Sequence, residues 1–338
     1  KRGMTIDIGF AFLSEEITLI DVPGHEKFVK NMMAGVSGID AAILVIAADD
    51  GVMPQTREHL EILKLLDIKV GIIVINKIDL VDNDWLELVE LDLQELVENT
   101  FLGSSPIHKV SAINNIGIEQ LKTAILEIPP QIPQKYDRGF FRLPIDRVFS
   151  IKGFGSVVTG TVSAGEIAVG ESIEVLPLGE TYKVRGIQSH DSSVESISLG
   201  SRAAINIQGL DIKDIKRGNQ ITTPNYIESH DSIAVELSAI SNAPSIKQNQ
   251  RIRVHLGTQE VMGRVSIIDK KSIEAGESSA AVIKLEQPLI STIGDRFIIR
   301  LYSPIITIGG GEIIDTSLFG KWKEIKTHVS KLYQVPKD

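Results

Sequence analysis

Two short motifs carry most of the chemistry that this sequence offers. Asp21-Val-Pro-Gly-His25 places a carboxylate, a glycine and an imidazole close together, and Asn76-Lys-Ile-Asp79 follows further along the chain. A carboxylate such as Asp21 can hold a hard divalent cation, usually through water. The N–H of Gly24 can face a phosphate because no side chain blocks the approach. His25 could then orient an attacking water, since phosphoryl transfer depends mainly on positioning.

The second motif can recognise a nucleotide base. The Asp79 carboxylate can accept two hydrogen bonds from the N1–H and N2–H₂ groups of guanine, a donor pair that adenine lacks. Asn76 can tie the loop and meet the base edge, and the stem of Lys77 can lie along the base plane. Ser111 and Ala112 follow the next apolar run and could complete the pocket through a backbone N–H. Together the motifs indicate two halves of a guanine-nucleotide site.

Each of these residues also has a simpler interpretation. Asp21 alone is a turn residue at a strand end, His25 alone is a residue at a helix start, and N-K-x-D patterns occur in many loops. Thr5 could contact the metal through its hydroxyl and a terminal phosphate through its N–H, or it could be an ordinary threonine at a strand edge. The order of the motifs, each after an apolar run, favours the nucleotide site.

The elements that must position these residues alternate between strand and helix. The run Ala41–Ala48 is entirely apolar and is expected to be a strand buried on both faces. Strands alternating with helices predict a mostly parallel sheet covered on both sides, with ligand residues at the carboxyl ends of the strands. The expected strands are 6–13, 16–20, 41–48, 70–75 and 107–110, and the expected helices are 26–36, 54–66, 84–99 and 117–126.

The chain changes character after Pro129-Pro-Gln-Ile-Pro133, which is a stiff break. Beyond it, short runs rich in Val, Ile and Thr are separated by glycines, a pattern typical of antiparallel β-barrels or sandwiches. A second break lies at Thr223-Pro-Asn225. We therefore expect a nucleotide domain over 1–130, a barrel over 138–226, a second barrel over 228–318, and a basic helical tail over 319–338.

Composition narrows the class of protein. Cysteine is absent, which excludes disulfides and thiolate zinc sites. No apolar run approaches the length of a membrane span, so a cytoplasmic location is expected. The net charge is −9, and residues 1–134 hold 10 basic against 21 acidic side chains. Any contact with RNA must therefore use patches outside this acidic first part.

One expected motif is absent. No G-x-x-x-x-G-K-[ST] loop occurs in the 338 residues, so the chain lacks the lysine and the backbone cradle for a β-phosphate. A doubly wound nucleotide sheet places the strand of that loop centrally. Without it, backbone groups of the neighbouring strands would remain unpaired at about 1–3 kcal/mol each. We therefore expect that the chain is a fragment or that its first segment is not represented.

Several stretches resemble the translation-factor GTPases: Arg2–Phe10, Asp21–Glu26, Asn76–Asp79 and Ser111-Ala112. Within that superfamily, the spelling RGMTIDIG and the stretch RLPIDRVFSIKGFGSVVTGT at 142–161 look like the selenocysteine-specific elongation factors of bacteria. The resemblance covers essentially the whole chain. It implies a multi-domain fold, with an α/β P-loop GTPase-like domain, incomplete at its N-terminus, followed by two antiparallel β-barrels.

The resemblance also implies GTP/GDP and Mg²⁺ as cofactors, and it assigns roles to the motif residues. The implied roles are Mg²⁺ ligation by Thr5 and Asp21, contact with the γ-phosphate by Gly24, orientation of the hydrolytic water by His25, and guanine recognition by Asn76, Lys77, Asp79, Ser111 and Ala112. The loop around Thr5 and the segment around His25 would be the nucleotide-sensitive switches.

In the second domain, the resemblance places an aminoacyl pocket at Asp146, Arg147 and Arg202. A selenol is far more acidic than a thiol, so a selenocysteine cargo should arrive as an anion. Two fixed guanidinium groups would then favour it over neutral serine, with Asp146 holding the arginines in place. Surface salt bridging in a barrel is the alternative interpretation of the two arginines.

The implied function is delivery of selenocysteinyl-tRNA to the ribosome at recoded UGA codons, with GTP hydrolysis. Bacterial members also bind a messenger-RNA hairpin through a C-terminal extension of winged helices that this chain does not include. A monomer without membrane contact is expected. The alternatives are a general elongation or initiation GTPase, the GTPase subunit of sulfate adenylyltransferase, and an RNA-binding module that has lost its nucleotide.

Overall fold

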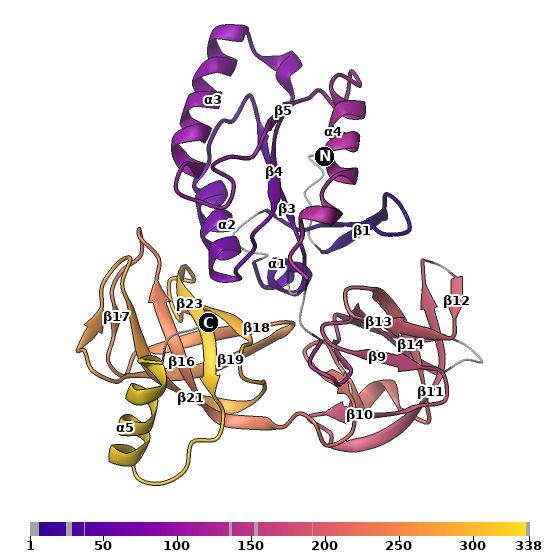
Figure 1. The fold of residues 1–338 in the computed structure, drawn as a ribbon, viewed down its shortest axis with the longest axis vertical. Helices are drawn as coiled ribbons and strands as arrows, with labels where there is room; N and C mark the ends of the chain where they lie inside the picture. Colours follow the sequence, from indigo (N-terminus) through magenta and orange to yellow (C-terminus); the bar gives the residue numbers. More distant parts are fainter. Residues whose placement is uncertain are drawn as a thin grey trace. The chain divides into compact units, whose positions relative to one another are not determined.

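The computed structural model describes residues 7–24, 29–36, 38–134, 137–151, 155–190 and 192–335. The chain divides into two compact units (Figure 1). The sheet unit is Ile39–Lys135, and the barrel unit combines Lys1–Gly38 with Tyr136–Asp338. An α/β part followed by antiparallel β-structure is the order that the sequence predicts. Within the described ranges, no helix combines the length and apolar character needed to cross a lipid bilayer.

The sheet unit is built on a three-stranded parallel sheet with the order β3-β4-β5. Helices α2 and α3 lie along one side of this sheet and α4 along the other (Figure 1). Pro54 occupies the first turn of α2, where its missing N–H is not needed. The Asp82 side chain caps α3 by accepting from the Trp85 N–H at 2.9 Å. The elements are β3 (Ala42–Ala47), α2 (Pro54–Leu65), β4 (Gly71–Asn76), η2 (Ile78–Leu80), α3 (Asn83–Val97), β5 (Ile107–Lys109), α4 (Ile118–Leu126) and η3 (Pro129–Gln131).

The expectation that the first apolar strand is buried on both faces is wrong for β3. Its even-numbered residues, such as Leu44 and Ile46, pack into the core with Leu60 and Leu93. Val45 points the other way and is 58% exposed. In β4, by contrast, five consecutive residues are buried. An apolar run therefore identified both strands, but it did not show which faces are covered.

The barrel unit begins with an antiparallel hairpin and a short helix. Strands β1 (Gly9–Phe12) and β2 (Thr18–Asp21) pair with Phe10 opposite Ile20, and α1 (Val29–Val36) follows. An eight-stranded antiparallel sheet comes next, with the order β6-β15-β10-β11-β14-β8-β7 and β12 attached to β11. Its strands are β6 (Arg142–Pro144), β7 (Arg147–Ile151), β8 (Gly155–Thr161), β10 (Ser172–Leu176), β11 (Glu180–Ser189), β12 (Ser192–Val194), β14 (Arg202–Gln208) and β15 (Gln220–Thr222).

This first barrel is a curled sheet around a single apolar core rather than a closed ring in the described part of the chain. Leu143, Ile205 and Ile221 are among the core side chains that are fully buried. A small separate sheet pairs β9 (Glu166–Ala168) with β13 (Ser196–Ser198), and the turn η4 (Ile212–Asp214) precedes β15.

The second barrel is closed, with the strands in the order β16-β21-β19-β18-β22-β23. Its core is almost entirely Val, Ile and Leu. The strands are β16 (Ser229–Ala239), β18 (Arg251–Leu256), β19 (Gln259–Ile267), β21 (Ser278–Ile290), β22 (Arg296–Leu301) and β23 (Thr307–Asp315), and a small pair joins β17 (Ile246–Lys247) to β20 (Ser272–Ile273).

Strand β23 closes the ring, and its glycines permit this. A Cβ atom on Gly311 would overlap the carbonyl oxygen of Glu236 on β16, and one on Gly309 would overlap that of Ser238. The two backbones therefore approach more closely than side chains would allow. The basic tail also packs on this barrel, since Val329 of α5 (Trp322–Tyr333) is buried and His328 Nε2 lies 2.7 Å from Asp315 Oδ2.

Candidate guanine and aminoacyl sites

The predicted base-recognition residues come together at the carboxyl ends of β4 and β5. The Asn76 side chain lies at the centre, because its Oδ1 atom accepts from the Lys77 N–H at 2.8 Å and from the Ala112 N–H at 3.1 Å. One amide thus joins the two loops. Ser111 is fully buried, and its Oγ accepts from the Asn114 N–H at 3.2 Å. This fixes the loop that presents the Ala112 backbone.

Lys77 adopts a left-handed backbone conformation with φ of 62° and is tethered across the site. Its Nζ donates to both Asp49 carboxylate oxygens, at 2.9 and 3.0 Å. The hydrogen bond from Lys77 is the main cause that lowers the pKa of the Asp49 carboxyl. We did not predict Asp49 from the sequence, although its place just after β3 was the available signal. The tether fixes the lysine stem at the mouth of the predicted base pocket.

Asp79 lies in the short turn η2 and is exposed. The turn is held against the end of β5 by a hydrogen bond of 3.3 Å from the Ile78 N–H to the Val110 carbonyl. The carboxylate is therefore accessible to a ligand while its backbone is fixed. Such an arrangement fits a carboxylate that must meet the two donors of a guanine edge.

The predicted phosphate and metal residues belong to the barrel unit or lie outside the described residues. Asp21 is the exposed last residue of β2 and pairs with Gly9, and Gly24 is exposed three residues later. Thr5 and His25 lie outside the described residues. Among the residues that are described, no group of three or more acidic or histidine side chains could enclose a metal ion. A single carboxylate such as Asp21 fits a Mg²⁺ ion that takes its other ligands from phosphates and water.

The three residues of the predicted aminoacyl pocket also come together. Arg202 begins β14 and Asp146 immediately precedes β7, and both strands pair with β8. The guanidinium of Arg202 donates to Asp146 through two nitrogens, at 2.7 and 3.0 Å. Thr159 adds a hydrogen bond to the same carboxylate at 2.8 Å. This paired, largely buried fork is more ordered than a surface salt bridge.

Strand β1 contributes contacts to this pocket that sequence reasoning missed. The ring of Phe10 lies under the Arg202 guanidinium, whose carbon is 3.5 Å from the ring centroid. Arg147 donates to the carbonyl of Ile8 and lies 3.6 Å from the Asp7 carboxylate. No local pattern marks these contacts, because they join residues more than a hundred positions apart.

Arg217 is a further cation near these residues, and no motif in the sequence points to it. Burial lowers its pKa, which is also affected by the charges of Asp7, Asp146 and Arg147. One of its nitrogens donates to the side-chain oxygen of Asn31 on α1 at 3.0 Å. Arg217 therefore links α1 to the charged residues of the predicted aminoacyl pocket in the same unit.

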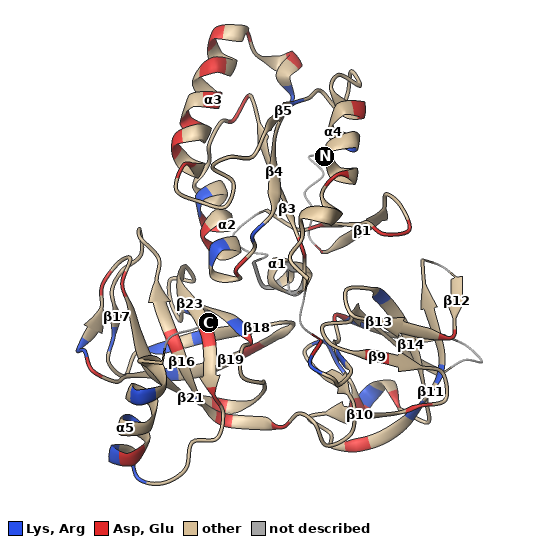
Figure 2. Cartoon of the chain, in the orientation of Figure 1, with Lys and Arg blue, Asp and Glu red and all other residues tan. Residues whose placement is uncertain are grey.

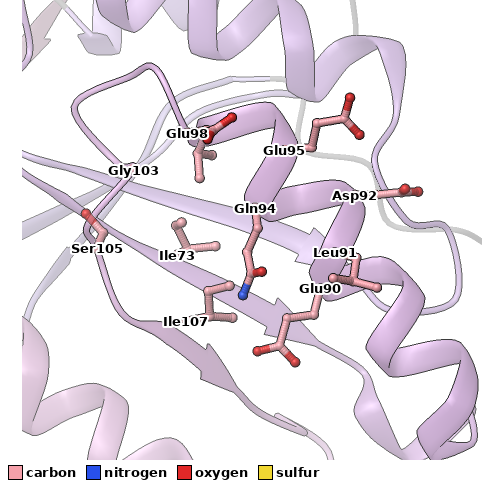
Figure 3. A pocket seen from close by; sticks show the side chains of 11 residues that line it. Ile73, Glu90, Leu91, Asp92, Gln94, Glu95, Glu98, Gly103, Ser105 and Ile107 are labelled. Carbon is pink, nitrogen blue, oxygen red and sulfur yellow. The ribbon is translucent and has the colours of Figure 1, made fainter.

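A cavity formed by described residues of the sheet unit lies away from the predicted sites. It has a volume of about 730 Å³ and is lined by one side of α3 and by the segment leading into β5 (Figure 3). Glu90, Glu95 and Glu98 line it, together with Ile73 and Ile107. It contains none of the predicted site residues, and its acidic lining does not suit a phosphate ligand.

Comparison with known proteins identifies relatives along the whole chain. Residues 1–131 match the family described as the elongation factor Tu GTP binding domain, and residues 230–318 match the β-barrel domain of the selenocysteine-specific elongation factor. The selenocysteine-specific elongation factor of Desulfomicrobium baculatum is 42% identical over 320 residues, which are 93% of this chain and 50% of that protein. The chain thus spans about half the length of this relative.

Two further comparisons extend the match. The selenocysteine-specific elongation factor of Methanocaldococcus jannaschii is 33% identical over 364 residues and is matched over 76% of its length by the whole of this chain. The crystal structure of a bacterial selenocysteine-specific elongation factor superposes with a TM-score of 0.88 and 32% identity, covering 98% of this chain and 56% of that one. The predicted order of a GTPase-type domain and β-barrel domains is confirmed, and the chain belongs to the family of selenocysteine-specific elongation factors.

Proposed function

We propose that the whole protein is a GTP-dependent elongation factor that delivers selenocysteinyl-tRNA to the ribosome at recoded UGA codons and hydrolyses GTP. The names of the relatives support this assignment. Residues 1–130 would form the GTPase domain, 138–226 the barrel that holds the aminoacyl end, 228–318 the second barrel and 319–338 a linker. The protein would act as a monomer in the cytoplasm, where translation takes place.

The observation that carries the nucleotide assignment is the bridge made by Asn76. By joining the Lys77 and Ala112 backbones it fixes the loops that carry the exposed Asp79 carboxylate and the Ala112 amide. In this proposal Asp79 accepts from guanine N1–H and N2–H₂, while Lys77 covers the base plane. Ser111 supports the loop because its Oγ accepts from the Asn114 N–H. GTP and GDP would both fit, because none of these contacts involves the terminal phosphate.

The remaining steps are assigned to the phosphate side of the site. Asp21 and Thr5 would hold Mg²⁺, which neutralises charge on the β- and γ-phosphates when it is bound. The Gly24 N–H would face the γ-phosphate, and the His25 imidazole would orient the attacking water. These residues would position groups rather than form covalent bonds, as phosphoryl transfer requires.

The predicted aminoacyl pocket of the barrel unit would recognise the cargo. A selenocysteine side chain is an anion under conditions in which serine is neutral. A pocket that contains Asp146, Arg147 and Arg202 therefore offers a physical basis for choosing between the two aminoacyl groups. Two sets of contacts support this proposal: Arg202 is paired with Asp146, and Arg147 and Arg202 both lie against the Phe10 ring.

Nucleotide binding by the whole protein and by a variant at Asp79 tests the proposal. Calorimetric titration should show that GTP binds and ATP does not. Asp79→Asn should weaken GTP by about a hundredfold, because it removes a charged acceptor and turns one oxygen into a donor, while xanthosine triphosphate should bind more tightly than before. Asp82→Asn is the matched control, since Asp82 caps α3 nearby and has no predicted base contact. Equal binding of GTP and ATP by the unaltered protein would refute the assignment.

A further inference from the structure

The Asp146–Arg202 pair is closed on itself. Its side chains are only 5% and 13% exposed, and both forked nitrogens of Arg202 are used on the Asp146 carboxylate. One face of the guanidinium is covered by the Phe10 ring. The two charges of the pair therefore neutralise each other in direct contact. Separating the pair would leave a buried charge without a counter-charge, which is unfavourable.

Arg147 has a different environment, although it is adjacent to Asp146 in sequence. Its side chain is 44% exposed, and the Asp7 carboxylate that lies 3.6 Å away is 58% exposed. Its other partners are uncharged: the carbonyl of Ile8, and the Phe10 ring, whose centroid lies 5.5 Å from the guanidinium carbon. An exposed ion pair of this kind contributes about 0–1 kcal/mol. Arg147 can therefore exchange Asp7 for another anion at little cost.

The charged side chains around the pocket carry a net positive charge, which can be traced to one arginine. The cluster contains the aspartates Asp7 and Asp146 and the arginines Arg147, Arg202 and Arg217, which is one positive charge in excess. Arg202 is neutralised by Asp146, and Arg217 is half-buried and bonded to Asn31 of α1. Of these cations, Arg147 is the one that combines exposure with an exchangeable partner.

We propose that Arg147 alone binds the anionic side chain of the cargo, and that Arg202 is a positioning residue that Asp146 and Phe10 hold as a neutral platform. This inference rests on the proposed function and gives each of the two arginines a separate role. Arg147 would exchange the Asp7 carboxylate for the incoming selenolate, so that its own charge remains paired. The platform would fix the shape of the pocket and contribute equally to anionic and neutral cargo.

The test compares the dissociation constants of selenocysteinyl-tRNA and seryl-tRNA on the whole protein with GTP, and uses their ratio as the measure of preference. Arg147→Gln should reduce the preference about tenfold or more, which is the effect of losing one hydrogen bond to a charged group. The double variant Asp146→Leu/Arg202→Met removes both charges of the platform. It should weaken both cargoes and keep the preference within about threefold.

Asp146→Asn provides a sharper test because the two interpretations predict opposite signs. If Arg202 is neutralised by Asp146, removing the carboxylate charge frees a second cation and should raise the preference for selenocysteinyl-tRNA. If instead Arg202 binds the anion and Asp146 only holds it in place, the same variant should lower the preference. A lowered preference would overturn the inference, as would a double variant that loses as much preference as Arg147→Gln.

Folding and the underlying function are controlled separately. Each variant is first compared with the unaltered protein by its unfolding midpoint, and Arg147→Lys, which keeps the charge, should retain a preference above that of Arg147→Gln. If the double variant does not fold, the single variants at Asp146 and Arg147 still decide the question by the sign of their effects. Equal affinity of the unaltered protein for both cargoes would refute the proposed function itself, whereas an altered pattern among the variants would refute only the division of labour.

Discussion

A buried ion pair connects the curled sheet to the closed barrel, and its removal should be costly. The Nη1 atom of Arg142 on β6 lies 2.7 Å from Oδ1 of Asp295, the residue just before β22. The two side chains are 7% and 10% exposed, respectively. Arg142 also donates from Nε to Gln220 at 2.7 Å. Asp295 accepts from the Thr292 N–H at 2.9 Å, and Arg138 lies 3.6 Å away. We consider the variant Asp295→Asn, which keeps the shape and removes the charge.

The expected loss follows from the environment of Arg142. With Asp295 neutral, the Arg142 charge keeps only dipolar partners in a site that excludes water. Breaking a buried pair by neutralising one partner costs about 3–5 kcal/mol, whereas replacing both partners with apolar residues of similar size is close to neutral. Asp295→Asn should therefore lower the free energy of unfolding of the barrel unit by about 3–5 kcal/mol. Arg142→Met/Asp295→Leu should lower it by much less.

Tryptophan fluorescence can follow this unfolding. The chain has two tryptophans, Trp85 in the sheet unit and Trp322 at the start of α5. In a Trp85→Phe background, urea titration with Trp322 as the reporter gives the midpoint and slope for the barrel unit. A loss below about 1 kcal/mol for Asp295→Asn, with an unchanged slope, would contradict the reasoning, because such a value belongs to an exposed pair.

The same pair predicts a dependence on pH. Burial alone would raise the pKa of the Asp295 carboxyl, but the charge of Arg142 and the hydrogen bonds outweigh it, so the pKa lies below its usual value of 3.8. A group whose pKa is lowered by folding stabilises the folded state above its unfolded value. The contribution of Asp295 should therefore be complete above pH 3.8 and be lost as the pH falls further. Asp295→Asn should lack this component in parallel titrations.

Two other predictions concern the barrels. Gly311→Ala should lower the free energy of unfolding by more than about 2 kcal/mol, because the new Cβ would push against the Glu236 carbonyl across the closing strands. Gly186→Ala is the control, because a Cβ at that position meets open space. Equal effects of the two variants in urea titration would refute the argument. The hydrogen bond to Glu180 raises the pKa of Tyr182 to about 12, so Glu180→Gln should move its spectrophotometric titration toward 10, and an unchanged midpoint would contradict this cause.

Periodicity and apolar runs were sufficient to predict much of the fold. The predicted strands 41–48 and 70–75 correspond to β3 and β4 within a residue at each end, and helix α2 ends within a residue of its predicted end. Strand β23 lacks such a signal, because its three consecutive glycines are disfavoured in strands, while their role is to let two backbones approach. The exposed face of β3 at Val45 was missed for a related reason: burial depends on what covers a strand, and the strand's own sequence does not record it.

The contacts in the candidate sites could also be predicted only in part from the sequence. Asn76 and Ala112 could be placed in one site in advance because Asn76 ends β4 and Ala112 follows β5, and parallel strands end at one edge of a sheet. Phe10 and Arg217 could not, since their contacts with the pocket depend on how the hairpin and α1 pack on the curled sheet. Asp49 was accessible to the same argument as Asn76, because it lies two residues after the end of β3.

The charge of the sheet unit has a kinetic consequence. Residues 39–135 hold 7 basic and 16 acidic side chains, and α3 carries five acidic residues and no basic one (Figure 2). A polyanion that diffuses toward this unit meets repulsion over roughly a Debye length, about 8 Å at physiological salt. Encounters with that surface will mostly end without capture. Repulsion by the acidic unit would therefore slow any association of RNA through this surface, and this effect should fade as salt is added.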